Sequence, residues 1–330
     1  MKAIIPMAGS GTRLRPLTYS RPKALLRVGS KPIIAHIIDS LLTIGCGKLV
    51  LIISSEGRKI PLYVKEHYPN IETETIIQEE QLGLGHAVSL AEKKAGDTEL
   101  IVIYGDTIIG DDISGIVDRS VDGVIAVKEV EDPRRFGVVN VKNGIITRFV
   151  EKPSVPESNL AIIGFNYFKN SDVLFECLNE IIEKNLKTKE EYQITDAFQI
   201  MVERGIKMKP FMIDEWFDAG TPQTLLETNR HILKEEGNRK SMPGSIIIPP
   251  VYIPDNASIS NSIIGPDVSV GENAIIEKSI ISNSIIGDGA KIENSHLSGS
   301  LIGNNARVIY SPRKLAISDH SNLDFDSEEK

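Results

Sequence analysis

Aliphatic residues recur at every fifth or sixth position along the last part of the chain, and this interval restricts the possible folds more than any other feature. The residues between them are mostly Gly, Asn, Ser and Asp. A helix would repeat its apolar positions every three or four residues, and a flat strand every two. Short strands joined by tight turns, each with one inward aliphatic side chain, explain the interval as a β-solenoid. The recurring residues are Ile253, Ile259, Ile264, Val270, Ile276, Ile281, Ile286, Ile292, Leu297, Ile302 and Val308.

We therefore expect a solenoid of hexapeptide-type repeats over residues 245–310, with room for about three coils. An ordinary meander of Ile-rich strands is the alternative. Residues 311–330 follow as an acidic tail, which ends in DHSNLDFDSEEK and which we expect to fray.

Residues 1–236 have a different pattern, in which short apolar runs alternate with longer amphipathic ones. The apolar runs are nearly continuous, as in parallel strands that are covered on both faces. The amphipathic runs end near a glycine, which is typical of helix termini. This alternation predicts an α/β domain with a mostly parallel sheet between layers of helices. The expected strands are 2–7, 48–53, 74–78 and 99–105, and the expected helices between them are 33–45 and 84–96.

The middle of this domain reads as antiparallel. Asn143-Gly144 lies between two β-rich runs and is a strong hairpin signal. The same domain then returns to helical patterns. The expected antiparallel segments are 123–130, 136–153 and 160–168, and the later helices are 171–185, 195–205 and 221–237.

Composition excludes several classes of function. The net charge is −8 and only 5% of residues are aromatic, so a nucleic-acid surface is not supported. Cys46 and Cys177 lack metal-type spacing, which fits a reducing compartment. Because the sequence has no signal-peptide pattern and no run of 18 apolar residues, we expect a soluble, cytoplasmic protein without a membrane or nucleic-acid partner.

The opening stretch MAGSGTRLRPLT predicts an anion site, because a glycine-rich turn after a strand presents backbone N–H groups to a ligand. A dinucleotide fingerprint needs a third glycine, and a P-loop needs Gly-Lys-Ser/Thr; both are missing. A plain tight turn would explain Gly9 and Gly11, but not the positive charge of Arg13, Arg15 and Lys23. Guanidinium groups of this kind make bidentate phosphate contacts.

GSGTRLRPLT followed by RPKALLRVGSKPI resembles the signature of the sugar-1-phosphate nucleotidyltransferases. QLGLGHAV, YGDT, FGVVNV with FVEKP, GFNYF, EYQITDA and WFDAGT are similar to further motifs of that family, in the same order across residues 1–230. With the solenoid, the resemblance covers about nine tenths of the chain. It implies a Rossmann-like mixed sheet, a C-terminal left-handed β-helix, and the reaction of an NTP with a sugar 1-phosphate to give an NDP-sugar and pyrophosphate.

Such a reaction needs cations and positioning rather than a covalent nucleophile. Arg13 and Lys23 are therefore the expected catalytic residues. The resemblance implies Mg²⁺ as cofactor, held by Asp106 and Asp218, although either aspartate by itself could be a turn former. More than one hundred residues separate the two, so only the fold can bring them together.

The resemblance also assigns the two substrates to residues of this chain. Glu151 can accept hydrogen bonds from sugar hydroxyls and Lys152 can pair with the sugar's phosphate; a solvated pair at a strand end is the alternative. Glycines let backbone approach a ligand closely, and His86 reads as a packing residue. The expected nucleotide-binding residues are Met7, Ala8, Gly9, Ser10, Gly11, Thr12, Arg13, Gln78 and Gly83; the sugar-phosphate residues are Gly137, Glu151, Lys152 and Gly164, with Phe136 and Asn166 at further family positions.

The Gln78 amide suits the imide edge of thymine or uracil, since it can donate and accept together. The QLGLGHAV turn is more similar to thymidylyl- and uridylyltransferases than to guanylyltransferases. We therefore expect dTTP and glucose 1-phosphate first, as in a glucose-1-phosphate thymidylyltransferase, with UTP second and a mannose-1-phosphate guanylyltransferase as a further alternative.

Two other classes of function remain open. An inactive regulatory paralogue is expected to lose charged site residues, but Arg13, Lys23, Asp106, Lys152 and Asp218 are all present. A second, acyltransferase activity would need a longer solenoid with a catalytic base. Because its only histidine is His296, we expect the solenoid to support assembly, and we expect the protein to form a homo-oligomer.

Overall fold

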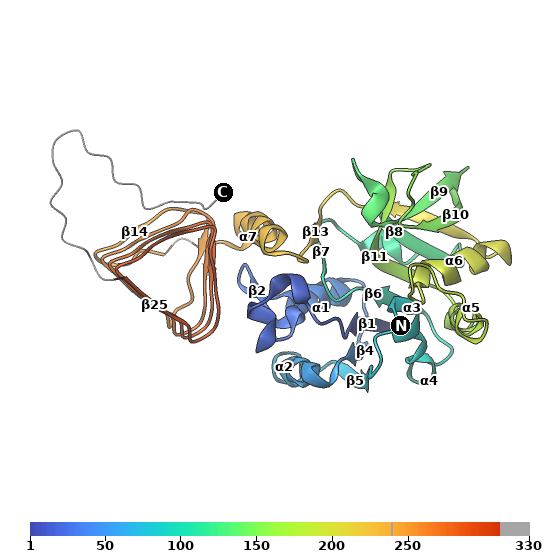
Figure 1. The fold of residues 1–330 in the computed structure, drawn as a ribbon, viewed down its shortest axis with the longest axis horizontal. Helices are drawn as coiled ribbons and strands as arrows, with labels where there is room; N and C mark the ends of the chain where they lie inside the picture. The colour runs from blue at the N-terminus through green and yellow to red at the C-terminus, as the bar shows by residue number, and fades with distance from the viewer. Residues whose placement is uncertain (239, 311–330) are drawn as a thin grey trace. The chain divides into compact units, whose positions relative to one another are not determined.

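The computed structural model describes residues 1–238 and 240–310, which form two compact units that divide after Gly237 (Figure 1). The first unit holds all seven described α-helices, and the second consists of short strands. The acidic tail expected over residues 311–330 lies outside the described residues.

A mixed nine-stranded sheet forms the centre of the first unit, in the order β10-β9-β11-β6-β1-β4-β5, with β8 paired to β11 and β12 paired to β8. Strands β6, β1, β4 and β5 run parallel. This confirms the prediction made from their continuous apolar runs. Their bounds are β1 Lys2–Met7, β4 Lys48–Ile53, β5 Glu72–Ile77 and β6 Leu100–Ile103.

The other part of the sheet is antiparallel, as the middle of the sequence predicted. β11 pairs with β6, β8 and β9, and the β9–β10 hairpin turns at Asn143 and Gly144, both of which have positive φ. The bounds are β8 Gly123–Glu129, β9 Gly137–Lys142, β10 Ile145–Glu151, β11 Leu160–Phe168 and β12 Met208–Met212.

Seven α-helices accompany the sheet. The prediction of a single helix over residues 84–96 is wrong, because this segment is divided into the two helices α3 and α4. The N–H of Ala91 bonds to Val88 O, three residues back, and this tight turn interrupts the helix while both apolar side chains stay buried. The helices are α1 Ile33–Thr43, α2 Lys59–His67, α3 Leu84–Ser89, α4 Glu92–Ala95, α5 Ser171–Glu183, α6 Ile194–Glu203 and α7 Pro222–Glu236.

Two short antiparallel strand pairs and several 3₁₀ turns complete the first unit. Apolar periodicity gave no indication of them because each is only two to four residues long. The paired strands are β2 Arg27–Val28 with β3 Lys31–Pro32, and β7 Thr107–Ile109 with β13 Trp216–Asp218. The 3₁₀ turns are η1 Thr12–Leu14, η2 Leu17–Tyr19, η3 Lys23–Leu25, η4 Ser55–Arg58, η5 Ser114–Ile116 and η6 Pro133–Arg135.

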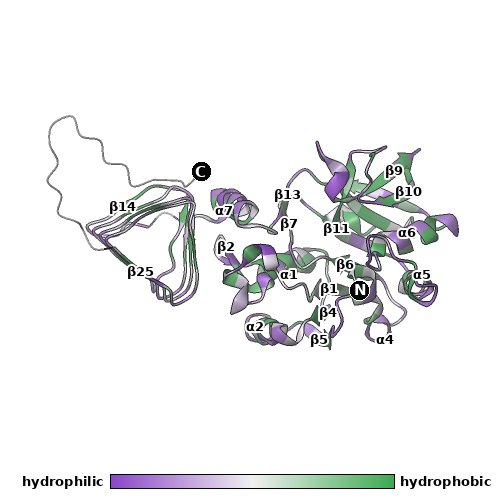
Figure 2. Ribbon diagram, in the orientation of Figure 1, coloured by the Kyte–Doolittle hydropathy of each residue, from purple (hydrophilic) through white to green (hydrophobic). Residues whose placement is uncertain are grey.

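Apolar residues fill both faces of the central strands, which are green along their length in Figure 2. On one face, Ile4, Val50 and Val102 share a core with residues of α3, α5 and α6. The alternate residues, such as Ile5 and Leu51, are also fully buried and point to the opposite face. The sheet is therefore a buried layer between helices.

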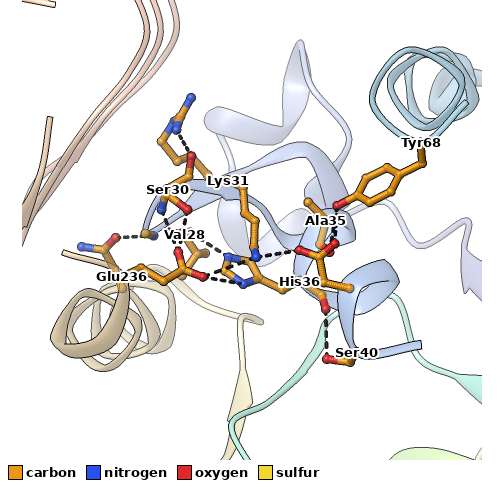
Figure 3. A network of polar contacts seen from close by, with 12 residues as sticks. Val28, Ser30, Lys31, Ala35, His36, Ser40, Tyr68 and Glu236 are labelled. Carbon is orange, nitrogen blue, oxygen red and sulfur yellow. Dashed lines mark hydrogen bonds and ion pairs between the residues drawn. The ribbon is translucent and has the colours of Figure 1, made fainter. Parts of the chain in front are cut away.

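Polar contacts fix the end of α7 to the start of the chain (Figure 3). Glu236, the last residue of α7, accepts hydrogen bonds from the backbone N–H and the hydroxyl of Ser30. Its Oε1 lies 3.4 Å from Lys31 Nζ and 3.7 Å from His36 Nδ1. Lys31 also pairs with Asp39 at 2.7 Å. These contacts fix the C-terminal end of α7. The helix begins at Pro222, four residues after Asp218.

The second unit consists of three four-stranded parallel sheets, stacked as in a left-handed parallel β-helix. The predicted inward aliphatic residues are confirmed: eight of the eleven are buried in one apolar cluster along its interior, and Leu297, Ile302 and Val308 are partly buried and pack against it. The structure has four coils, not about three, since each sheet contributes four strands between Ile246 and Ile309. The strands are β14 Ile246–Ile247, β15 Val251–Tyr252, β16 Ser258–Ser260, β17 Ile263–Ile264, β18 Val268–Val270, β19 Ile275–Glu277, β20 Ile280–Ser282, β21 Ser284–Ile286, β22 Lys291–Glu293, β23 His296–Ser298, β24 Leu301–Ile302 and β25 Arg307–Ile309.

Polar residues at the corners explain why the spacing is five or six. Asn261, Asn283 and Asn294 adopt positive φ, a conformation that asparagine tolerates better than most residues. Serines stack between coils: the hydroxyl of Ser262 accepts from the N–H of Ser279, whose own hydroxyl accepts from Ser295. Each corner thus satisfies backbone groups that the short strands leave unpaired.

Within residues 1–238 and 240–310, no helix is long and apolar enough to cross a membrane. Cys46 and Cys177 are free and buried. Burial raises the pKa of both thiols, in the case of Cys177 to about 11, so both remain protonated at neutral pH.

Candidate active site

The glycine-rich loop begins where β1 ends and leads into η1, which carries Arg13. Gly11 has a φ of 59°, and a Cβ at this position would lie 3.0 Å from Thr18 Cγ2. The Thr18 hydroxyl donates to Gly11 O at 2.8 Å, which fixes the turn. A larger residue at position 11 would be both strained and crowded.

A first pocket of about 440 Å³ opens at the carboxyl ends of β1, β5 and β6. Ligands of open α/β sheets bind at this edge. All but one of the predicted nucleotide-binding residues line it, the exception being Ser10. The predicted residues that line the pocket are Met7, Ala8, Gly9, Gly11, Thr12, Arg13, Gln78 and Gly83, together with Lys23 and Asp106.

Gln78 occupies a nearly buried position in this pocket, with only 5% of its surface exposed. Its Nε2 lies 3.3 Å from Nδ1 of His86, which comes from α3. Gly83 has a φ of 114°, and a Cβ there would lie 2.6 Å from Tyr192 O. The absence of a side chain at Gly83 therefore lets the QLGLGHAV turn pack on the EYQITDA segment.

Lys23 and Asp106 form an ion pair in the first pocket, with Lys23 Nζ 2.6 Å from Asp106 Oδ2. The β7–β13 pair sets Asp218 opposite Thr107, the residue that follows Asp106. The fold thus brings together two aspartates that are far apart in sequence. The pKa of Asp218 is raised, first by burial and then by the negative charge of Asp106, while Lys23, Arg13 and Arg135 partly offset this effect.

The two aspartates suit a divalent cation. Two neighbouring carboxylates, one of them with a raised pKa, form a negatively charged spot that a cation would neutralise. Among the residues that the structure describes, no group of three or more His, Cys, Asp or Glu could hold a metal ion. A cation here would therefore need further oxygen ligands from substrate phosphates or water, as Mg²⁺ sites commonly have.

A second pocket of about 330 Å³ adjoins the first, and both are lined by Arg13, Leu84, Tyr104, Asp106 and Glu191. It contains the predicted residues Gly137, Glu151 and Lys152, together with Phe136 and Asp218.

Glu151 is held rigidly in the second pocket. Its side chain is 7% exposed, accepts from the Thr195 hydroxyl at 2.7 Å and lies 3.2 Å from Lys152 Nζ. A Cβ at Gly137 would lie 3.0 Å from Glu151 Oε2, so glycine leaves room for this carboxylate. The pocket thus presents a fixed acceptor next to a cation.

Other predicted residues lie beside the pockets rather than on their walls. Gly164 has a φ of 81°, and a Cβ there would lie 2.1 Å from Cδ2 of Tyr104. Gly164 therefore makes space for Tyr104, which lines both pockets. Asn166 is fully buried, and the Arg15 guanidinium lies 5.0 Å from the centre of the Tyr19 ring.

Sequence reasoning missed several residues that line the pockets. Most of them belong to motifs quoted above in which only some residues receive a role: Tyr104 in YGDT, Gln81 in QLGLGHAV, and Thr195 in EYQITDA. Trp216 is the first residue of WFDAGT, and Arg135 directly precedes Phe136 of FGVVNV. The missed lining residues are Tyr104, Gln81, Glu191, Gln193, Thr195, Arg135 and Trp216.

The arrangement suits a reaction between two anions. The first pocket offers a glycine-rich loop with Arg13 and Lys23, and the second offers Lys152 beside a rigid carboxylate. Asp106 lines both pockets at the point where they meet. Two ligands could therefore bind side by side and react at the boundary, with cations close to the reacting groups.

Comparison with known proteins agrees with this geometry. The family model described as nucleotidyl transferase matches residues 2–235. The UTP–glucose-1-phosphate uridylyltransferase AglF of Haloferax volcanii is 32% identical over 243 residues, 71% of this chain and 98% of that protein. A glucose-1-phosphate thymidylyltransferase of Streptomyces antibioticus is 30% identical, over 71% of this chain and 67% of the relative.

The bifunctional protein GlmU of Methanocaldococcus jannaschii is 37% identical over 240 residues, which is 71% of this chain but only 54% of that protein. Among solved structures, a putative glucose-1-phosphate thymidylyltransferase of Bacillus anthracis in complex with sucrose has a TM-score of 0.62 at 28% identity. That match covers 73% of this chain and 98% of the other.

Proposed function

Because the chain belongs to the nucleotidyl transferase family and is a sugar-1-phosphate nucleotidyltransferase, we propose that its substrates are a pyrimidine nucleoside triphosphate and glucose 1-phosphate. We place dTTP first and UTP second. The products are the NDP-glucose and pyrophosphate.

One observation carries this proposal: two pockets meet at Arg13, Tyr104 and Asp106. The nucleoside triphosphate would occupy the first pocket, with its phosphates on the glycine-rich loop. The sugar phosphate would occupy the second, with hydroxyl groups on Glu151. The α-phosphorus and the attacking oxygen would then lie at the boundary.

The reaction is an in-line displacement. An oxygen of the sugar's phosphate forms a bond to the α-phosphorus, the bond from that phosphorus to the bridging oxygen breaks, and pyrophosphate leaves with the electron pair. Arg13 would hold the triphosphate through its planar fork of donors. Lys23 would stabilise the charge that develops on the reacting phosphates.

Asp106 and Asp218 are the residues that would hold Mg²⁺. When bound, the ion would bring phosphate oxygens together and offset their negative charge. Before substrate binds, Lys23 already partly neutralises Asp106.

The proposed pyrimidine preference rests on Gln78. Its carboxamide is nearly buried, and His86 lies against its Nε2. The remaining donor and acceptor would match the imide of thymine or uracil, which presents an N–H between two carbonyl groups.

The test is a comparison of kcat/KM for dTTP, UTP, GTP and ATP with glucose 1-phosphate, measured by pyrophosphate release. We expect both pyrimidine nucleotides to exceed GTP and ATP by at least about tenfold, since a buried amide that meets the wrong base edge is left unpaired. A preference for GTP would contradict the assignment of the base. The same assay with mannose 1-phosphate and N-acetylglucosamine 1-phosphate tests the sugar.

A further inference from the structure

Arg135 is a second arginine at the two pockets, in addition to Arg13, and it lines only the second pocket. It is the last residue of η6, directly before Phe136 and Gly137, and it lines the second pocket but not the first. Its side chain is exposed. Among residues 1–238 and 240–310, the Arg135 guanidinium has no hydrogen-bond or ion-pair partner.

The neighbouring Arg134 also belongs to η6 and is also exposed, but it differs in its partners and in its position relative to the pockets. Its guanidinium makes two hydrogen bonds to Asp132, at 2.7 and 2.8 Å. It lines neither pocket. Two arginines adjacent in sequence thus differ in their partners: one is tied to a surface carboxylate, and the other is left open towards the second pocket.

The other cations near the second pocket are already engaged or shared. Lys152 pairs with Glu151, and Lys23 pairs with Asp106. Arg13 lines both pockets, so a triphosphate in the first pocket would compete for it. Arg135 is the guanidinium that remains for an anion in the second pocket.

The position of Arg135 also fits the reacting end of that pocket. Arg135 and Asp218 both line the second pocket. Asp218 lies beside Asp106, at the boundary of the two pockets. An anion bound between Arg135 and Lys152 would therefore lie close to the boundary, with the sugar ring directed towards Glu151.

We propose that Arg135 binds the phosphate of the sugar 1-phosphate and so positions its oxygen for attack, an inference that rests on the proposed function. The triphosphate is held by the loop and Arg13, without Arg135. Arg135 thus separates recognition of the second substrate from recognition of the first.

The experiment compares Arg135→Gln, Arg135→Lys and Arg134→Gln in the full chain. Steady-state kinetics vary glucose 1-phosphate at saturating nucleotide and then the reverse. In Arg135→Gln we expect KM for glucose 1-phosphate to rise about 10- to 100-fold, the loss typical of a charged hydrogen bond, with KM for the nucleotide within about twofold. Arg135→Lys should recover part of the loss, because it restores the charge without the fork.

Arg134→Gln removes the same charge one residue away, retains the Asp132 bond to the backbone N–H of residue 134, and should keep both KM values. Equal KM values in the two glutamine variants, or a rise in KM for the nucleotide instead, would overturn the role of Arg135. The wild-type chain separates this failure from a failure of the proposed function: if it forms no NDP-sugar with any pairing, the function itself is wrong.

Discussion

Lys23 and Asp106 are 83 residues apart in sequence, yet Lys23 Nζ lies 2.6 Å from Asp106 Oδ2. The pair holds the lysine at the boundary of the two pockets before any phosphate binds. A phosphate that enters can replace the carboxylate as partner of Lys23, which would free Asp106 for a cation. The ion pair thus couples the positive and negative groups on which the proposed chemistry depends.

Removal of either aspartate's charge tests this coupling. Asp106→Asn and Asp218→Asn should each lower kcat by about 100-fold or more, because the proposed Mg²⁺ ligands are lost. Circular dichroism should show an intact fold. Asp97→Asn, at an exposed position outside both pockets, is the control and should retain full activity. Near-normal turnover of the two site variants at saturating Mg²⁺ would remove the pair from the site.

The raised pKa of Asp218 predicts that Asp218→Asn, which should lower kcat, increases the stability of the folded protein. Burial and the charge of Asp106 penalise the ionised carboxylate in the folded state. This penalty is absent below the ordinary value of 3.8 and grows as pH rises through the raised pKa. Without Mg²⁺, Asp218→Asn should therefore melt at a higher temperature than wild type at pH 7, and the difference should shrink towards pH 3.8. A lower Tm at pH 7 would contradict this.

Gly164 should be needed for the position of Tyr104. Alanine at a φ of 81° is strained by about 1–2 kcal/mol, and its Cβ would overlap the Tyr104 ring. Gly205→Ala is a matched control, because Gly205 has a φ of 85° and nothing within 4 Å of the added Cβ. We expect Gly164→Ala to lose more stability in urea than the control, and to raise KM for both substrates. Equal losses would show that Tyr104 is not constrained by Gly164.

Glu236 should stabilise the first unit in a pH-dependent way. Burial would raise its pKa, but hydrogen bonds from Ser30 and the charges of His36 and Lys31 outweigh burial and lower it. The stability that these contacts contribute is present above the ordinary value of 4.5 and is lost as pH falls through the lowered pKa. Glu236→Gln should cost about 1–3 kcal/mol at pH 7 and less near pH 4.

The control for Glu236 is the exposed neighbour Glu235, which precedes it on α7. Glu235→Gln should change the free energy of unfolding by less than about 0.5 kcal/mol. Urea denaturation at both pH values provides the measurement. A cost for Glu236→Gln that does not depend on pH would indicate a packing role in place of the ionic one.

The sequence predicted best what a repeated local pattern controls. The inward aliphatic positions of the β-helix follow from their spacing, as do the parallel strands from their continuous apolar runs. It underestimated the number of coils, because the recurring aliphatic residues were counted from Ile253, whereas the first coil already begins with β14 at Ile246.

The site was less accessible from sequence. Asp106 and Asp218 are close to each other because β7 pairs with β13. Each of these strands is only three residues long and shows no detectable periodicity. Arg135 and Arg134 look equivalent in sequence, and only the structure distinguishes the arginine bound to Asp132 from the one that lines the second pocket. Long-range pairing of this kind leaves no local pattern to read.

Transfer of a label tests the central claim most directly. The full chain is incubated with Mg²⁺, glucose 1-phosphate and dTTP or UTP labelled at the α-phosphorus, and the products are separated by chromatography. We predict that the label appears in the NDP-glucose and not in pyrophosphate, and that the Lys23→Met variant loses this transfer. Absence of labelled NDP-sugar from the folded wild-type protein, with either nucleotide, would contradict the account.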